Sequence, residues 1–175
     1  MSFIAPWEIF ARFEPAYPDA AALAFVGPMA IVWFYMSWYD MSRLKIRNRL
    51  VFVVMALFAA VGPFVMPTDL YFEQIIQAAI VLVVVLVLYA AGTMGGGDAK
   101  YIAAASPYFL REDAGLILVI FTACVLGAVA THRLMRRVGV ADSVADWASW
   151  SSGKRFPLGF ALGGVTTFYL ALAAF

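Results

Sequence analysis

Five stretches of the chain contain no Asp, Glu, Lys or Arg and are about long enough to cross a lipid bilayer. They cover residues 20–39, 50–68, 74–97, 114–131 and 156–175. A membrane-spanning helix needs about 20 predominantly apolar residues, and helices satisfy their own backbone hydrogen bonds in lipid. Charged residues make up 13% of the chain, against roughly 25% in an ordinary soluble domain. The sequence therefore predicts an all-α integral membrane protein and excludes a soluble enzyme.

The short segment 99–110 decides the predicted topology. Its apolar run is short for a span and carries Lys100 near its start. The connection at residues 43–49 is basic, so the positive-inside rule places it in the cytoplasm. If segment 99–110 also crosses, ten of the twelve Lys and Arg residues are cytoplasmic and seven of the eleven acids are outside. We therefore expect six transmembrane helices with both termini on the non-cytoplasmic side, and about 24 Å of helix between Asp98 and Asp113.

The sequence gives no reason to divide the chain, so residues 1–175 are expected to form one membrane-embedded domain. Residues 1–19 lack a basic start and a long apolar run, so we expect an interfacial segment rather than a signal peptide. Residues 133–155 form the largest predicted cytoplasmic loop, in which Trp147 and Trp150 suit the headgroup level. We expect the lipid bilayer to surround this domain.

Charge and cysteine content narrow the classes of function further. The net charge is +1, which gives no case for binding nucleic acid. The single cysteine, Cys124, allows neither an internal disulfide nor a Cys-rich zinc site. Cys124 is expected to be an inert membrane thiol, and His132, the only histidine, a cation near a basic helix end. We expect no metal and no cofactor.

Two acids do not fit a simple membrane protein. Asp40 and Asp98 each fall at the cytoplasmic end of a predicted span, where an ionisable group is costly and usually functional. A plain alternative makes Asp40 an interfacial carboxylate balanced by Arg43 and Lys45. The corresponding alternative makes Asp98 the N-cap of a helix that starts at Ala99. Both acids lie on the same side of the membrane in the predicted topology.

Three consecutive glycines, residues 95–97, precede the second of these acids. A glycine run weakens the end of a spanning helix but lets another backbone approach closely, so it indicates a turn that presents Asp98. Two carboxyl groups from different helices can form a hydrolytic pair. One acts as a general base on water, while the other, protonated, polarises the scissile carbonyl.

Three motifs resemble those of the type IV prepilin peptidases, a family of aspartic membrane proteases. The sequence MGGGDAK at residues 94–100 resembles the family's GxGDxK motif. WYD at residues 38–40 precedes a basic stretch that contains Ile46 and Asn48, although Arg47 stands where the family usually has proline. KRFPLGFA at residues 154–161 resembles the Pro-x-Gly segment that enters the last helix.

This resemblance implies a role for particular residues. It makes Asp40 and Asp98 the catalytic pair, working without a metal. The supporting motif positions that it implies are Gly95, Gly97, Lys100, Ile46, Asn48, Pro157 and Gly159. The last two are expected to shape the final helix near the site.

The resemblance also implies a reaction. The chain lacks the paired cysteines of the long members that also methylate their product, so it resembles the short, peptidase-only branch of Flp-type tight-adherence pili. The implied activity is removal of a short basic leader from a prepilin at the cytoplasmic face of the inner membrane. The cleaved bond lies just before the precursor's apolar helix. The resemblance also implies pilus-assembly proteins as further partners.

Other functions stay open at this point. An archaeal-type preflagellin peptidase would share the motifs and differ in its substrate. A presenilin-like protease would need nine helices, for which this chain is too short. A small non-enzymatic transporter or assembly subunit would use the two acids to couple ions.

Overall fold

The structure, a computed structural model, describes residues 14–139, 143–151 and 157–175. The regular elements among these residues are all helices, with no strand. The elements are α2 (Asp19–Arg43), α3 (Asn48–Val65), α4 (Thr68–Ala90), α5 (Gly96–Ala105), η1 (Ser106–Tyr108), η2 (Arg111–Asp113), α6 (Ala114–Arg137), α8 (Ala148–Ser151) and α9 (Leu158–Ala174). The prediction of an all-helical chain holds over the residues described.

Four helical segments are long and apolar enough to cross a membrane. They are α2, α3, α4 and the continuous stretch Arg111–Arg137 that comprises η2 and α6. The apolar α9 has 17 residues and is shorter than these four. Four of the predicted spans are thus found as helices of sufficient length and apolar character.

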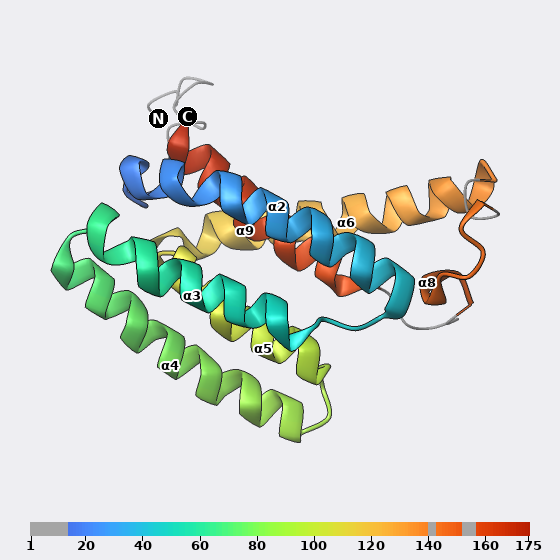
Figure 1. The fold of residues 1–175 in the computed structure, drawn as a ribbon, viewed down its shortest axis with the longest axis horizontal. Coiled ribbons are helices and arrows are strands. Elements are labelled where there is room, and N and C mark those ends of the chain that lie inside the picture. The colour runs from blue at the N-terminus through green and yellow to red at the C-terminus, as the bar shows by residue number, and fades with distance from the viewer. Residues whose placement is uncertain (1–13, 140–142, 152–156) are drawn as a thin grey trace, which may run out of the picture.

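The longer helices run back and forth between two ends of the molecule (Figure 1). At one end, which we call the cleft end, Lys100 Nζ in α5 donates to Asn48 Oδ1 at the start of α3, over 3.3 Å. At the other, the far end, Tyr17 OH lies 3.7 Å from Met66 Sδ, just after α3. Short connections force neighbouring helices to be antiparallel, so the ends of α2 and α4 meet the starts of α3 and α5. The start of α9 reaches the same end, where Gly159 contacts Asp40.

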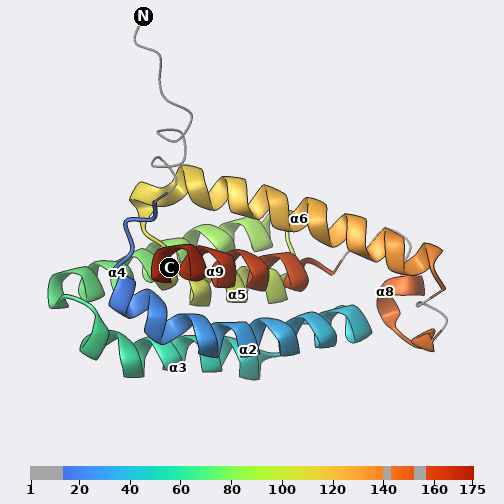
Figure 2. The ribbon, with the colours of Figure 1, turned by 90° about the horizontal axis from the view of Figure 1, so that it is seen from above.

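Helix α9 forms the centre of the packing, flanked by α2 on one side and α6 on the other (Figure 2). Small residues allow this close approach, as is usual between helices in membranes. A Cβ atom at Gly163 would lie only 2.7 Å from both Trp33 Cδ1 and Met36 Cε. The indole N–H of Trp33 donates to the carbonyl oxygen of Phe160 at 2.8 Å, which fixes α2 against α9.

Helix α5 is much shorter than the predicted helix between Asp98 and Asp113. Its α-helical part has 10 residues, about 15 Å, and is followed by the two 3₁₀ turns η1 and η2. The expectation of about 24 Å of helix was wrong, because Pro107 cannot supply the backbone N–H that would continue the helix.

The glycine run also has a different place from the predicted one. Helix α4 ends at Ala90, and Gly92, at φ 73°, makes the turn that follows. Gly95 is the N-cap of α5, and Gly96 and Gly97 are its first two residues. The run therefore opens α5 rather than ending the third span.

Two expectations fall partly outside the described residues. Of the predicted interfacial segment 1–19, residues 1–13 are not described, while Tyr17 is buried and α2 begins at Asp19. Of the predicted loop 133–155, residues 140–142 and 152–155 are not described. The described part of that loop includes the end of α6, at Arg137, and α8.

Candidate active site

Asp40 lies in the last turn of α2, and its side chain is buried, with 5% of its surface exposed. Leu44 caps the end of the helix in a left-handed conformation (φ 51°), and its N–H donates to the carbonyl oxygen of Asp40 at 2.7 Å. The Asp40 carboxylate atom Oδ2 accepts a hydrogen bond of 2.7 Å from the backbone N–H of Gly159. Among the described residues, no ion pair joins Asp40 to Arg43 or Lys45, which is where the plain alternative placed its partners.

The partner of Asp40 is therefore the start of α9. Pro157 is the N-cap of that helix, and Gly159 is its second residue. The first N–H groups of a helix have no partner within the helix, and the helix dipole favours an anion there. A Cβ atom at Gly159 would lie 2.8 Å from Asp40 Oδ2 and 3.1 Å from Asp40 Cβ, so the contact requires glycine.

Asp98 is the third residue of α5 and is half-buried. The alternative in which Asp98 caps a helix starting at Ala99 was wrong, because Gly95 is the N-cap and the helix starts at Gly96. The Asp98 side chain folds back, so that a Cβ atom at Gly95 would lie 2.9 Å from Asp98 Oδ2. Each of the two carboxylates thus occupies space that a side chain at a neighbouring glycine would fill.

Asp40 and Asp98 line one cleft of about 700 Å³ at the cleft end of the molecule. We call this space the two-aspartate cleft. The remaining residues that line it are Leu44, Lys45, Ile46, Gly92, Thr93, Met94, Gly95, Gly96, Gly97 and Leu158.

The connection between α2 and α3 forms part of the wall of the cleft. Ile46 lies against the start of α5, where a Cβ atom at Gly97 would come within 3.3 Å of Ile46 Cβ and 3.5 Å of its backbone nitrogen. The bond from Lys100 to Asn48 crosses the same junction. The structure therefore brings together four residues that the motifs had singled out.

Arg47 holds this connection against α2. Its guanidinium donates to Tyr35 OH at 3.1 Å and lies 5.1 Å from the centroid of the Tyr39 ring, directly before Asp40 in sequence. A cation over an aromatic face is attracted by the ring quadrupole. The sequence indicated Arg47 as part of a basic connection and as a departure from proline, and the tyrosines at 35 and 39 were the available signal for this contact.

Comparison with known proteins identifies the family. Residues 28–132 match the sequence model of the type IV leader peptidase family. This chain belongs to that family. The resemblance inferred from the motifs is thereby confirmed at the level of the family. A search of the curated proteins and of the solved structures gives no significant match.

The matched segment of this leader peptidase contains Asp40 and Asp98 together with the α2–α3 connection. It ends before α9, where the Pro-x-Gly resemblance had named Gly159, and the structure supplies the contact of that residue with Asp40. Leu158, which also lines the cleft, was missed in the sequence. Its position between Pro157 and Gly159 was the signal that could have found it.

The cleft of this leader peptidase offers carboxyl groups for chemistry. Asp40 Oδ1 and both oxygens of Asp98 accept no hydrogen bond from the described residues. The described residues contain no group of three or more His, Cys, Asp or Glu side chains suited to hold a metal ion. Both acids line a cleft of about 700 Å³, which is large enough to admit water or a peptide group.

Proposed function

We propose that this chain is an aspartic endopeptidase that removes the short leader of an Flp-type type IV prepilin, with Asp40 and Asp98 as its catalytic pair. The observation that carries the proposal is that these two acids, on helices separated in sequence, line one cleft. Membership of the type IV leader peptidase family supports a peptidase with a membrane-protein substrate. Several apolar helices support a multi-pass membrane protein.

The proposed reaction uses the pair as general base and general acid. One carboxylate removes a proton from a water molecule, and the resulting hydroxide oxygen bonds to the carbonyl carbon of the scissile peptide. The other carboxyl group, initially protonated, donates its proton to the carbonyl oxygen. The tetrahedral intermediate then breaks its C–N bond as a proton passes to the leaving nitrogen. The N–H of Gly159 orients Asp40 through Oδ2 and leaves Oδ1 for this exchange.

We further propose that α5 and α9 cross the membrane with the four longer helices, giving six spans in one domain with both termini outside. The cleft end then lies at the cytoplasmic face of the inner membrane. The distribution of charge supports this orientation. The basic connection at residues 43–49 is at the cleft end, while the acids Asp69 and Glu73 lie on α4 near the far end.

The proposed activity is cleavage without methylation. Cys124, the only cysteine, lies within α6, so the chain has no paired cysteines of the kind that mark the bifunctional members. The substrate is a membrane precursor whose basic leader is cut just before its apolar helix. Pilus-assembly proteins are the proposed further partners.

The test is direct cleavage by the purified protein in detergent, with a full-length Flp-type prepilin as substrate. Mass spectrometry of the product should give a pilin that begins at the first residue after the leader. The same protein in vesicles should show no proton flux driven by an imposed gradient. An intact prepilin together with a proton flux would contradict the peptidase and favour the ion-coupling function.

A further inference from the structure

An apolar groove of about 590 Å³ runs between α4 and α6, with α5 and α9 at its base. Its walls and floor include Val81 on α4, Tyr101 on α5, Phe121 on α6 and Val165 on α9. Helix α4 packs on α5, and α6 packs on α9, which leaves this space between the two outer helices. We call it the α4–α6 groove. Exposed apolar side chains do not by themselves indicate a binding site here, because apolar helix faces in a membrane protein meet lipid.

The α4–α6 groove and the two-aspartate cleft lie along the same faces of two helices. In a helix, residues spaced by three and four positions share one face. Two sets have this spacing: Asp98, Ile102 and Ala105 on α5, and Leu158, Leu162 and Val165 on α9. In each set the first residue lines the cleft and the other two line the groove. The same face of each helix therefore leads from the cleft to this groove.

A second apolar groove, of about 520 Å³, lies between α3 and α4 and serves as a comparison. We call it the α3–α4 groove. It meets α5 at Lys100, Ala103 and Ala104, on the helix face opposite to Asp98. The two grooves are similar in size and apolar character, but only the α4–α6 groove shares the face of α5 that carries the acid.

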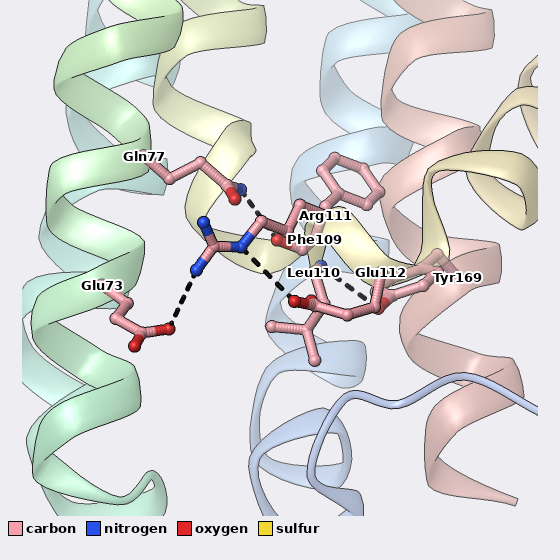
Figure 3. Close-up of polar contacts among 7 residues, drawn as sticks. All are labelled: Glu73, Gln77, Phe109, Leu110, Arg111, Glu112 and Tyr169. Carbon is pink, nitrogen blue, oxygen red and sulfur yellow. Dashed lines mark hydrogen bonds and ion pairs between the residues drawn. The ribbon is translucent and has the colours of Figure 1, made fainter.

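Two polar side chains, Gln77 and Arg111, border the α4–α6 groove at the far end of the molecule, and Figure 3 shows their contacts. The Gln77 side chain donates to two backbone carbonyl oxygens, those of Ser106 and Phe109, each at 2.8 Å. Arg111, which lines the groove, pairs with Glu73 on α4 over 3.4 Å. A helix in this groove would be in apolar surroundings beyond the cleft and would meet polar groups at the far end, which matches the pattern of a membrane-spanning segment.

We propose that the α4–α6 groove holds the apolar helix of the precursor while its leader junction occupies the two-aspartate cleft. The inference rests on the proposed function and adds the surface that binds the substrate in the membrane. The bond to be cut directly precedes that helix, so the helix must leave the cleft along an apolar surface. The groove on the Asp98 face of α5 provides that surface.

Disulfide crosslinking tests this placement. The enzyme carries Cys124→Ala, which removes its own thiol, and Asp98→Asn, which keeps the precursor uncut. Single cysteines then replace Leu118, in the groove and 64% exposed, or Leu126, on the same helix outside the groove and 65% exposed. Met55, 52% exposed, provides the cysteine position in the α3–α4 groove.

The probes are four variants of an Flp-type prepilin, each with a single cysteine at one of four successive positions midway along its apolar helix. Four successive positions cover a full helical turn, so in one variant the cysteine faces the enzyme. After oxidation, Leu118→Cys should give at least fivefold more crosslinked product than Leu126→Cys or Met55→Cys. Predominant crosslinking to Met55→Cys would overturn the inference in favour of the α3–α4 groove. Equal, low crosslinking at all three positions would show that the groove holds only lipid.

A cleavage assay separates this inference from the proposed function. In the otherwise unmodified enzyme, Leu118→Trp should raise the KM for prepilin at least fivefold with little change in kcat, and Leu126→Trp should change neither. Cleavage that is equally efficient in both variants would overturn the groove and leave the peptidase standing. Failure of the unmodified chain to cleave would overturn the proposed function and the groove with it.

Discussion

The carboxylate of Asp40 accepts a hydrogen bond of 2.7 Å from the backbone N–H of Gly159, although 119 positions separate the two residues. This bond fastens the end of α2 to the start of α9 at the edge of the two-aspartate cleft. It also fixes the orientation of a buried acid that forms no ion pair with any of the described residues, because the helix N-terminus supplies both the donor and a favourable field. The geometry of the site therefore depends on a residue with no reactive group.

Replacing Gly159 with alanine should disturb Asp40 directly. The new Cβ atom would lie 2.8 Å from Asp40 Oδ2, closer than real Cβ contacts allow, so the carboxylate must shift. Because a misplacement of about 1 Å can cost roughly 100-fold, we expect kcat for prepilin cleavage to fall roughly 10- to 100-fold. Gly27→Ala is the control, since a Cβ atom there meets nothing within 4 Å. Equal rates for the two variants would contradict the role given to Gly159.

Gly95→Ala should act on the other acid. Its Cβ atom would lie 2.9 Å from Asp98 Oδ2, and the contact ends at a side chain that can rotate away. We therefore expect a smaller loss, about 10-fold in kcat, when cleavage is followed by gel mobility of the shortened pilin. Gly115→Ala, where a Cβ atom meets nothing within 4 Å, should retain full activity. A fully active Gly95→Ala enzyme would show that Asp98 does not need its present position.

Arg47→Ala should loosen the wall of the cleft. The variant loses the bond to Tyr35 OH and the cation–aromatic contact with Tyr39, which together stabilise by about 1 kcal/mol. We expect lower thermal stability in detergent and a severalfold lower kcat, because Tyr39 directly precedes Asp40. Arg49→Ala removes the same charge from an exposed position and should change neither quantity. Matching behaviour of the two arginine variants would assign the effect to charge alone.

Asp113→Asn should affect stability at the far end rather than catalysis. Asp113 is buried, and its Oδ2 accepts hydrogen bonds from Tyr169 OH at 2.5 Å and from the Ala16 N–H at 2.8 Å. Loss of the charged acceptor should lower the free energy of unfolding by about 1–3 kcal/mol, while kcat of the folded enzyme stays within twofold. The exposed Asp69→Asn is the control, and calorimetry in detergent gives the comparison. A large loss of kcat in folded Asp113→Asn protein would show that the far end takes part in the reaction.

Much of this arrangement could be predicted because membrane sequences are strongly patterned. The long apolar runs predicted the four longest helices, since lipid demands both length and apolar side chains. Asp40 and Asp98 were predicted as candidates because acids at the ends of apolar helices are costly. The structure places both of them on one cleft.

The remainder depends on contacts that no local pattern records. The Pro-x-Gly resemblance named Gly159, but the bond from its backbone N–H to Asp40, 119 positions away, leaves no trace in side-chain chemistry. The glycines at 95–97 have the same composition whether they end one helix or begin the next. Asp113 was predicted only as one of the seven acids outside the membrane. Its contacts with Tyr169 and Ala16 could not be predicted, because both residues are distant from it in sequence.

Single-turnover cleavage of prepilin by Asp40→Asn and Asp98→Asn enzymes in lipid vesicles tests the central claim most directly. Each substitution preserves size and removes the acid–base function, so each should lower the rate by at least about 100-fold while the protein stays folded and inserted. Asp69→Asn, at the far end, should cleave at the unmodified rate. Cleavage at the unmodified rate by either Asp40→Asn or Asp98→Asn would contradict the account.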